Sequence, residues 1–215
     1  MISDIDSSLY RHIYVCGDIH GHLKLLNEKL NSLNFDRQQD LLIAVGDLVD
    51  RGPFSFDCLQ LITQPWFKSV KGNHEDFIEW TNDIDITGTH ISNGGSWYYN
   101  LTDQEQQTCL NLVRQLPLIL QTEIDSKKYA FIHAELPVTF SDWHNVHRDI
   151  QRPNFTESLL WGRSRITKNI TTLVKNIDTI FCGHTVIKQP VILGNHYYID
   201  TGSHYYGNLT IIQLK

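Results

Sequence analysis

The sequence has 215 residues, 41% of them hydrophobic, which is long enough to bury a core as a single domain over residues 1–215. Its formal net charge of −6 argues against nucleic-acid binding and against attraction to anionic membranes, so a phosphate-bearing substrate would need a local positive site. Residues 1–6 lack a basic segment and a long apolar stretch, and no later apolar run could span a bilayer. We therefore expect a cytoplasmic protein with four reduced cysteines, and the sequence indicates no oligomeric state.

The first third of the chain repeats one pattern three times: an apolar strand, a polar loop and an amphipathic helix. Strands are predicted over residues 11–16, 41–45 and 67–70, and helices over 22–33, 55–62 and about 73–80. Because open α/β sheets place their chemistry at the carboxyl ends of strands, the polar loops are the expected site.

The middle of the chain has a different character. Residues 81–117 predict a small helical cap inserted beside the site, with Asn93-Gly94-Gly95 as a structural turn. A helix is predicted over residues 103–116, with Thr102 or Asp103 as its N-cap. The aromatic cluster at residues 97–99 is expected in the core of the cap.

The second half alternates strands and loops. A hairpin is predicted from residues 121–124 and 128–132, and its second strand leads to His133. Residues 135–165 are aromatic and loop-rich, which suggests a substrate-facing surface or a long packed connection. The remaining strands are predicted over residues 179–182, 191–193, 197–199 and 209–213.

Six side chains that suit divalent metals each lie just after a predicted strand. They are Asp18, His20, Asp47, Asn73, His133 and His184. The set is too large for one tetrahedral zinc ion and contains no cysteine, so it favours a binuclear catalytic centre over a structural zinc site. Asp47 is the candidate bridging carboxylate, and a metal-bridging hydroxide could attack a phosphoryl group directly and in line.

The neighbouring residues suggest how such a reaction would be completed. His74 is the natural proton donor to the leaving group, with Asp50 holding its other ring nitrogen, although Asp50 could instead cap a helix or pair with Arg51. Arg51 and Arg163 can offer planar forks to phosphate, Arg165 competes with Arg163, and Asn73 is assigned to the phosphate as well as to the metal.

The blocks Asp18-x-His20-Gly21, Gly46-Asp47-x-x-Asp50-Arg51-Gly52, Gly72-Asn73-His74-Glu75, His133-Ala134 and Gly183-His184-Thr185 carry a resemblance. The chain resembles the phosphoprotein phosphatase branch of the calcineurin-like metallophosphoesterases, above all the small bacterial and bacteriophage serine/threonine phosphatases. The resemblance implies a two-sheet β-sandwich flanked by helices.

The resemblance also implies two divalent ions, most often Mn²⁺, with Fe, Zn, Ni or Mg as other choices. One ion would be held by Asp18, His20 and Asp47, and the other by Asp47, Asn73, His133 and His184. His74 with Asp50 would be the acid pair, and Arg51 with Arg163 would bind phosphate. The expected substrate is a phosphoserine or phosphothreonine protein or peptide, with phosphotyrosine added if the cleft is shallow.

Two segments depart from the relatives: Glu135-Leu136-Pro137, where they carry an aspartate and an aromatic residue, and Ser203-His204-Tyr205-Tyr206. We expect both to border the pocket and to affect substrate preference. The rival activity is that of a symmetrical diadenosine tetraphosphate hydrolase, a class that resembles this pattern but commonly lacks the aspartate before Arg51. A non-catalytic scaffold is the third reading, and it would predict missing ligands.

Several other residues are assigned simpler roles. The remaining histidines, His90 among them, are expected at the surface or in packing, and His204 is the one whose loop is expected to approach the site. Glu75 is expected to open a helix, where its charge suits the helix dipole.

Overall fold

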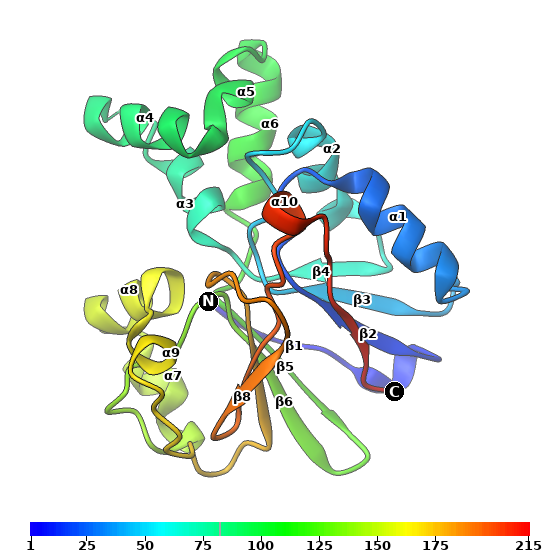
Figure 1. Cartoon of the computed structure of the whole chain (residues 1–215), viewed down its shortest axis with the longest axis vertical. Helices are drawn as coiled ribbons and strands as arrows, with labels where there is room; N and C mark the ends of the chain where they lie inside the picture. Colours follow the sequence, from blue (N-terminus) through cyan, green and yellow to red (C-terminus); the bar gives the residue numbers. More distant parts are fainter. Residues whose placement is uncertain (82) are drawn as a thin grey trace.

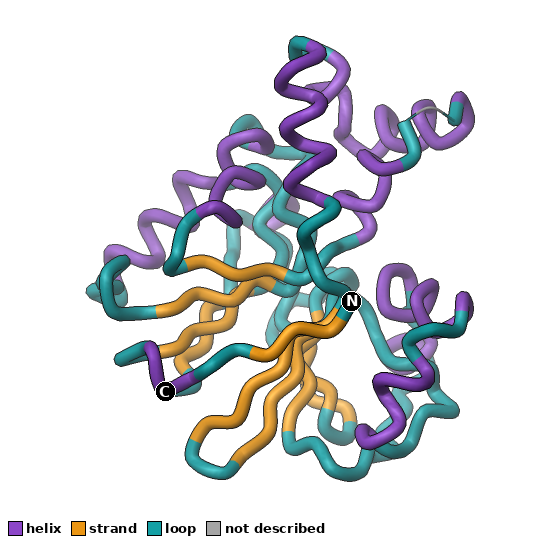
Figure 2. The backbone as a smooth tube through the Cα atoms, turned by 180° about the vertical axis from the view of Figure 1, so that it is seen from behind, coloured by secondary structure: helices purple, strands orange, loops and turns teal. Residues whose placement is uncertain are grey.

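The computed structural model describes residues 1–81 and 83–215. Two mixed sheets pack face to face, and helices cover their outer faces (Figures 1 and 2). The first sheet has the order β10-β2-β3-β4, with β10 antiparallel to β2 and the other pairs parallel. Its strands are β2 (Ile13–Cys16), β3 (Leu41–Ala44), β4 (Phe67–Ser69) and β10 (Ile211–Gln213).

The second sheet has the order β1-β5-β6-β7-β9-β8. Its strands are β1 (Ile2–Asp4), β5 (Ile119–Ile124), β6 (Lys127–Phe131), β7 (Thr179–Cys182), β8 (Val191–Leu193) and β9 (His196–Tyr198). The chain thus begins in this sheet, builds the first sheet, returns to the second and ends in the first. The two-sheet architecture expected from the resemblance is confirmed.

The alternation of side chains along the strands explains how the sheets form a sandwich. In β2, Ile13 and Val15 face the second sheet and meet Phe131 and Phe181 there, whereas Tyr14 and Cys16 face the helices. Both faces of the strand are buried, which is why it is continuously apolar in sequence.

Helices cover the outer face of each sheet. On the first sheet they are α1 (Leu23–Ser32), α2 (Ser55–Gln60) with the 3-10 turn η2 (Leu61–Thr63), and α3 (Asn73–Glu79). On the second sheet they are η4 (Trp143–Asn145), α7 (Val146–Asp149), α8 (Pro153–Trp161) and α9 (Ser164–Thr167). Short turns η1 (Ser7–Leu9) and α10 (Ser203–Tyr206) complete the chain.

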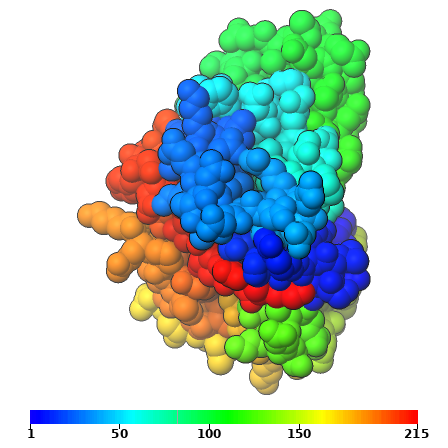
Figure 3. Space-filling model, turned by 90° about the vertical axis from the view of Figure 1, so that its right-hand side faces the viewer, coloured from blue at the N-terminus to red at the C-terminus, as the bar shows by residue number. Residues whose placement is uncertain are grey.

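The predicted cap contains α4 (Ile84–His90), the π-helical turn η3 (Ile91–Gly95), α5 (Ser96–Tyr99) and α6 (Asp103–Val113). These helices form one end of the molecule in Figure 3. Thr102 is the N-cap of α6 and shares a capping box with Glu105. Residue 82, which the predicted cap includes, lies outside the described residues.

The structure adds one strand that the sequence did not predict. β1 pairs in parallel with β5 from Ile2 opposite Ile119 to Asp4 opposite Gln121. Residues 135–165 follow the second of the two alternatives, a long packed connection, since α8 buries Phe155 and Leu159 against the second sheet.

All four cysteines are buried and unpaired, as expected. Within residues 1–81 and 83–215, no helix has both the length and the apolar character needed to cross a bilayer.

Candidate active site

The site lies where the loops after β2, β3 and β4 meet those after β6 and β7. The backbone there is unusual, because several residues other than glycine adopt positive φ. They are His20, Asp47, Asp50, Arg51 and His184, with φ between 46° and 70°. Strained backbone of this kind typically gathers at functional sites, where the surrounding structure enforces it.

Glu75 enforces the conformation of the loop after β3. Its carboxylate is fully buried and accepts the backbone N–H groups of Asp47, Leu48 and Val49 at 2.9, 2.8 and 3.2 Å, and that of Gly72 at 2.8 Å. Glu75 does lie in the first turn of α3, as expected, but its carboxylate also fixes the backbone that carries Asp47. The glycine is required, since a Cβ at position 72 would lie 2.2 Å from Asp47 Oδ1.

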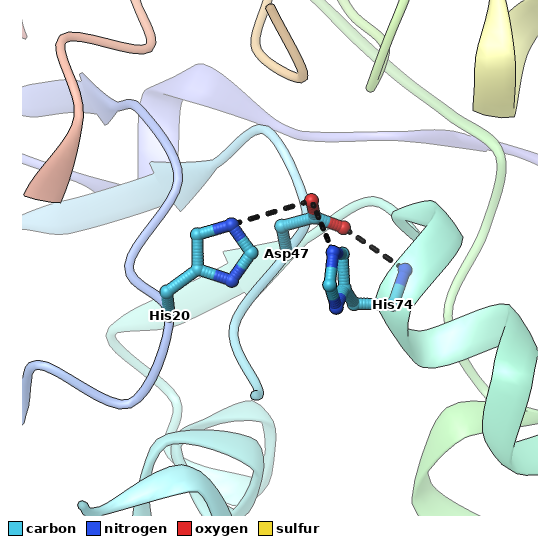
Figure 4. Close-up of side chains that lie close together, drawn as sticks. All are labelled: His20, Asp47 and His74. Carbon is cyan, nitrogen blue, oxygen red and sulfur yellow. Dashed lines mark hydrogen bonds and ion pairs between the residues drawn. The ribbon is translucent and has the colours of Figure 1, made fainter. Parts of the chain in front are cut away.

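The first cluster of metal-type ligands consists of His20, Asp47 and His74 (Figure 4). Asp47 Oδ2 lies 3.6 Å from His20 Nε2 and 3.9 Å from His74 Nε2, and Asp47 Oδ1 accepts the backbone N–H of His74 at 3.1 Å. His20 donates through Nδ1 to the carbonyl of Val49 at 2.8 Å, so its Nε2 carries the lone pair.

The second cluster consists of Asp47, His133 and His184. His133 Nε2 lies 3.3 Å from Asp47 Oδ1 and 2.8 Å from Asn73 Oδ1. His133 Nδ1 donates to the carbonyl of Val45 at 2.8 Å, which again leaves Nε2 as the lone pair that faces the site. Asp47 is common to both clusters, as a bridging ligand must be.

Asp18 lies beside these clusters without belonging to either of them. Its carboxylate accepts the backbone N–H of His184 at 3.0 Å. Asp200, to which the sequence analysis assigns no role, stands nearby: burial and the negative charge of Asp200 raise the pKa of Asp18. Burial likewise raises the pKa of Asp200 to about 6, and its Oδ2 has no hydrogen-bond partner among the described residues.

These features fit a metal. Burial lowers the pKa of His20 to about 3 and that of His184 to about 2, so both imidazoles are neutral near pH 7. The rings of His20 and His184 therefore supply no positive charge to the three buried carboxylates nearby, which are Asp18, Asp47 and Asp200. His184 Nε2 is buried with no partner among the described residues. Neutral imidazoles with lone pairs directed at a carboxylate cluster are what divalent cations bind.

The proposed acid pair is formed. Asp50 Oδ2 lies 2.6 Å from His74 Nδ1, and both side chains are buried. Burial alone would raise the pKa of Asp50, but hydrogen bonds from His74 and His90 outweigh it and lower the pKa. Burial opposes protonation of His74, yet the charge of Asp47 and the bond to Asp50 raise its pKa. Asp47 and Asp50 thus favour the protonated form of His74.

His90, expected at the surface or in packing, lies in the packed interior and also contacts the acid pair. It is fully buried, and its Nε2 lies 3.1 Å from Asp50 Oδ1. Trp97, expected only in the core of the cap, donates through Nε1 to the same oxygen at 2.7 Å. Sequence reasoning could not pair residues 40 and 47 positions away from Asp50.

A hollow of about 350 Å³ opens at His184, on one side of the second cluster. It is lined by Arg51, Arg163, His184, Thr185, Val186, Tyr205 and Tyr206. The Arg51 guanidinium donates to His20 Nε2 at 2.6 Å, and it lies 2.9 Å from His74 Nε2 and 5.8 Å from the centre of the Tyr205 ring. Arg163 donates to Thr185 Oγ1 at 3.1 Å. Both arginines thus border the same opening.

Arg165 does not compete with Arg163. Its side chain is fully buried and donates to the carbonyls of Ile170 and Thr172. Glu135, expected at the pocket border, does not line the hollow. It is buried and accepts the backbone N–H groups of Ser164 and Arg165 at 2.8 and 2.7 Å. It therefore fixes the loop that carries Arg163. Of the two departing segments, only residues 203–206 reach the hollow, through Tyr205 and Tyr206.

Comparison with known proteins agrees with this geometry. Residues 11–188 match the family model described as calcineurin-like phosphoesterase. The chain is 37% identical to serine/threonine-protein phosphatase 2 of Salmonella typhimurium over 99% of this chain and 97% of that protein. A symmetrical bis(5'-nucleosyl)-tetraphosphatase of Yersinia pestis is 48% identical, but over only 29% of this chain and 22% of that protein.

Among solved structures, a candidate diadenosine tetraphosphatase superposes with a TM-score of 0.66 at 19% identity, over 99% of this chain and 96% of the other. At that identity the likeness supports the fold alone. The family match spans most of the chain, and the bacterial relative spans nearly all of it. The chain therefore belongs to the calcineurin-like phosphoesterase family and is a phosphatase-type hydrolase.

Proposed function

We propose that this protein is a metal-dependent phosphatase acting on phosphoserine and phosphothreonine in proteins or peptides. The observation that carries the proposal is the buried Asp50–His74 pair, 2.6 Å apart, together with Arg51, which lies 2.9 Å from His74 Nε2 and borders the hollow with Arg163. The full-length similarity to a bacterial serine/threonine-protein phosphatase supports the substrate class.

The metal would be held by both halves of the molecule. His20, Asp18 and Asp47 would hold one ion, and Asp47, Asn73, His133 and His184 the other. Two bound divalent cations would supply the positive charge that a phosphoryl group requires and would acidify water. A donor set of oxygen and imidazole without thiolate suits Mn²⁺, which we propose as the working ion over Fe, Zn, Ni or Mg.

The remaining residues bind the phosphate and complete the proton transfer. His74 would protonate the leaving oxygen, since Asp50 holds its Nδ1 and leaves Nε2 directed at the site. Arg51 and Arg163 would hold phosphate oxygens with planar forks. Arg51 now donates to His20 Nε2, the lone pair that a cation would use, so metal binding would free its guanidinium to turn toward the phosphate.

The exposed rings of Tyr205 and Tyr206 border the hollow, with 62% and 61% of their surface accessible. An aryl group could stack on either ring, so we add phosphotyrosine as a secondary substrate. The rival is symmetrical hydrolysis of diadenosine tetraphosphate. It is favoured by the partial match to the Yersinia pestis protein, but that match covers less than a third of the chain.

A side-by-side assay tests the proposal. The protein loaded with Mn²⁺ is expected to hydrolyse phosphoserine and phosphothreonine peptides faster than diadenosine tetraphosphate, with Mg²⁺, Zn²⁺ and Ni²⁺ compared in parallel. Faster turnover of the dinucleotide would favour the rival.

The variant His74→Asn tests the acid role directly. We expect kcat on phosphoserine peptide to fall by about 10²–10⁴, because the leaving oxygen loses its proton donor, while manganese content measured by atomic absorption is unchanged. Near-normal turnover by this variant would remove His74 from the acid role.

A further inference from the structure

The carboxylate of Asp50 is bound from two sides. His74, from α3, forms a hydrogen bond to Oδ2 through Nδ1 at 2.6 Å. His90 and Trp97, both from the cap, form hydrogen bonds to Oδ1 at 3.1 and 2.7 Å. Asp50 and His90 are fully buried. A carboxylate bound at both oxygens cannot rotate without losing hydrogen bonds in a buried place, so the cap determines the plane in which Asp50 meets His74.

The hydrogen-bond network assigns the protons consistently. Because an ionised carboxylate only accepts, His90 must donate to it through Nε2. Its Nδ1 then carries a lone pair, and the hydroxyl of Tyr99, 3.1 Å away, donates to it. The neutral form of His90 therefore satisfies both ring nitrogens, and the chain of bonds runs from Tyr99 through His90 and Asp50 to His74.

Packing keeps His90 in this position. Its ring stacks on Phe77 with centroids 5.4 Å apart, and Phe77 in turn meets the edge of His74 at 5.8 Å. A Cβ at Gly95 would lie 2.0 Å from His90 Cδ2, so only glycine allows the turn to pass the ring. Gly94, at φ 97°, accepts the backbone N–H of Arg51 at 3.3 Å. The Asn93-Gly94-Gly95 turn thus fits the cap against the site.

We propose that His90 and Trp97 are positioning residues for the acid step: the cap orients Asp50, and through it His74, toward the leaving oxygen. This inference rests on the proposed function. As water oxygen bonds to phosphorus, the bond between phosphorus and the leaving oxygen breaks and its electron pair stays on that oxygen. The oxygen takes the proton of His74 Nε2, and the protons of the attacking water stay on the product phosphate or pass to solvent. The neutral imidazole then regains a proton from solvent.

The inference predicts a dependence on the leaving group that a merely structural role would not produce. The alkoxide of phosphoserine needs protonation as it departs, whereas the nitrophenolate of p-nitrophenyl phosphate is stable without it. A change in the orientation of His74 should therefore slow the hydrolysis of phosphoserine more than the hydrolysis of p-nitrophenyl phosphate.

The experiment compares Trp97→Phe and His90→Leu with wild type, all loaded with Mn²⁺, on phosphoserine peptide and p-nitrophenyl phosphate. In both variants we expect the ratio of kcat on phosphoserine peptide to kcat on p-nitrophenyl phosphate to fall at least ~10-fold, with KM and manganese content unchanged. Trp143→Phe is the matched control, because Trp143 Nε1 donates to Gln121 at 3.0 Å in the second sheet, away from the site. Its ratio should match that of wild type.

Two outcomes would overturn the inference: an equal fall on both substrates, or no fall on either. If His90→Leu fails to give a cooperative melt, Trp97→Phe, which keeps the aromatic ring and loses the N–H, decides alone. Wild-type protein that hydrolyses neither substrate would instead overturn the proposed function, so the two failures are distinguishable.

Discussion

Glu75 and Glu135 have the same structural role in different halves of the molecule. Each is a buried carboxylate that accepts backbone N–H groups and so fixes a site loop: Glu75 takes four around Asp47, and Glu135 takes two beside Arg163. The loop fixed by Glu75 carries the buried carboxylate of Asp47. The loop fixed by Glu135 carries Arg163, which borders the open hollow. Glu75 in the first half therefore fixes the backbone that carries Asp47, and Glu135 in the second half fixes the backbone of Arg163, which we propose as a phosphate ligand.

Glu75→Gln should have the larger effect of the two. Its amide N–H₂ would oppose two backbone N–H groups, so we expect a loss of roughly 2–3 kcal/mol in the free energy of unfolding and weaker Mn²⁺ binding. Urea denaturation and metal titration measure these. Unchanged metal affinity would show that the loop of Asp47 holds its shape without the carboxylate.

Glu135→Gln should affect substrate binding and leave the metal in place. Each oxygen of Glu135 accepts one N–H group, so one of the two contacts becomes mismatched at the loop of Arg163. We expect KM for phosphoserine peptide to rise about 10-fold, equivalent to ~1.4 kcal/mol. Manganese content should stay at the wild-type value, and kcat should change less than KM. A loss of manganese would mean that Glu135 acts through His133, two residues before it, and would end the division of labour between the halves.

Asp40→Asn should have the smallest effect, on stability alone. Asp40, just before β3, accepts from Arg11 at 3.0 and 2.9 Å and from the N–H of Asp36 at 2.8 Å. Burial alone would raise the pKa of Asp40, but these bonds outweigh it and lower the pKa. The carboxylate thus stabilises the fold above its unfolded pKa of about 3.9, and this stabilisation is lost as pH falls through the lower folded value.

We expect the melting temperature of Asp40→Asn at pH 7 to be a few degrees, roughly 2–4 °C, below wild type, and the gap to close as pH falls below about 4. Arg148→Met in the second half is the control, because the Arg148 side chain is 65% exposed and its pair with Asp149 should add little. A gap for Asp40→Asn that persists at pH 3 would contradict the assignment.

Local patterns predicted the strands and loops of the site because each strand is buried and followed at once by polar residues. The strand predicted over residues 179–182 coincides with β7, and both predicted hairpin strands are confirmed within two residues. β1 was not predicted because its three residues include only one apolar side chain and give no strand pattern. Pairing with β5, more than a hundred positions later, holds them in place.

The parts of the site that sequence could not predict depend on tertiary placement. The sequence around His90 and Asp200 does not indicate their places in the site. His90 contacts Asp50 from the cap, and Asp200 lies near Asp18, far from it in the sequence. The helix α8 was missed although Pro153 at its start and the spacing of Phe155 and Leu159 are helical signals, because its aromatic surroundings suggested a surface.

The number of manganese ions bound per chain tests most directly whether the two halves build one binuclear centre. After loading with Mn²⁺ and desalting, atomic absorption should give two ions per chain for wild type. His133→Ala, altered in the second half, should keep one ion and lose phosphoserine turnover. One ion or fewer on the wild-type chain, or two on His133→Ala, would contradict the account.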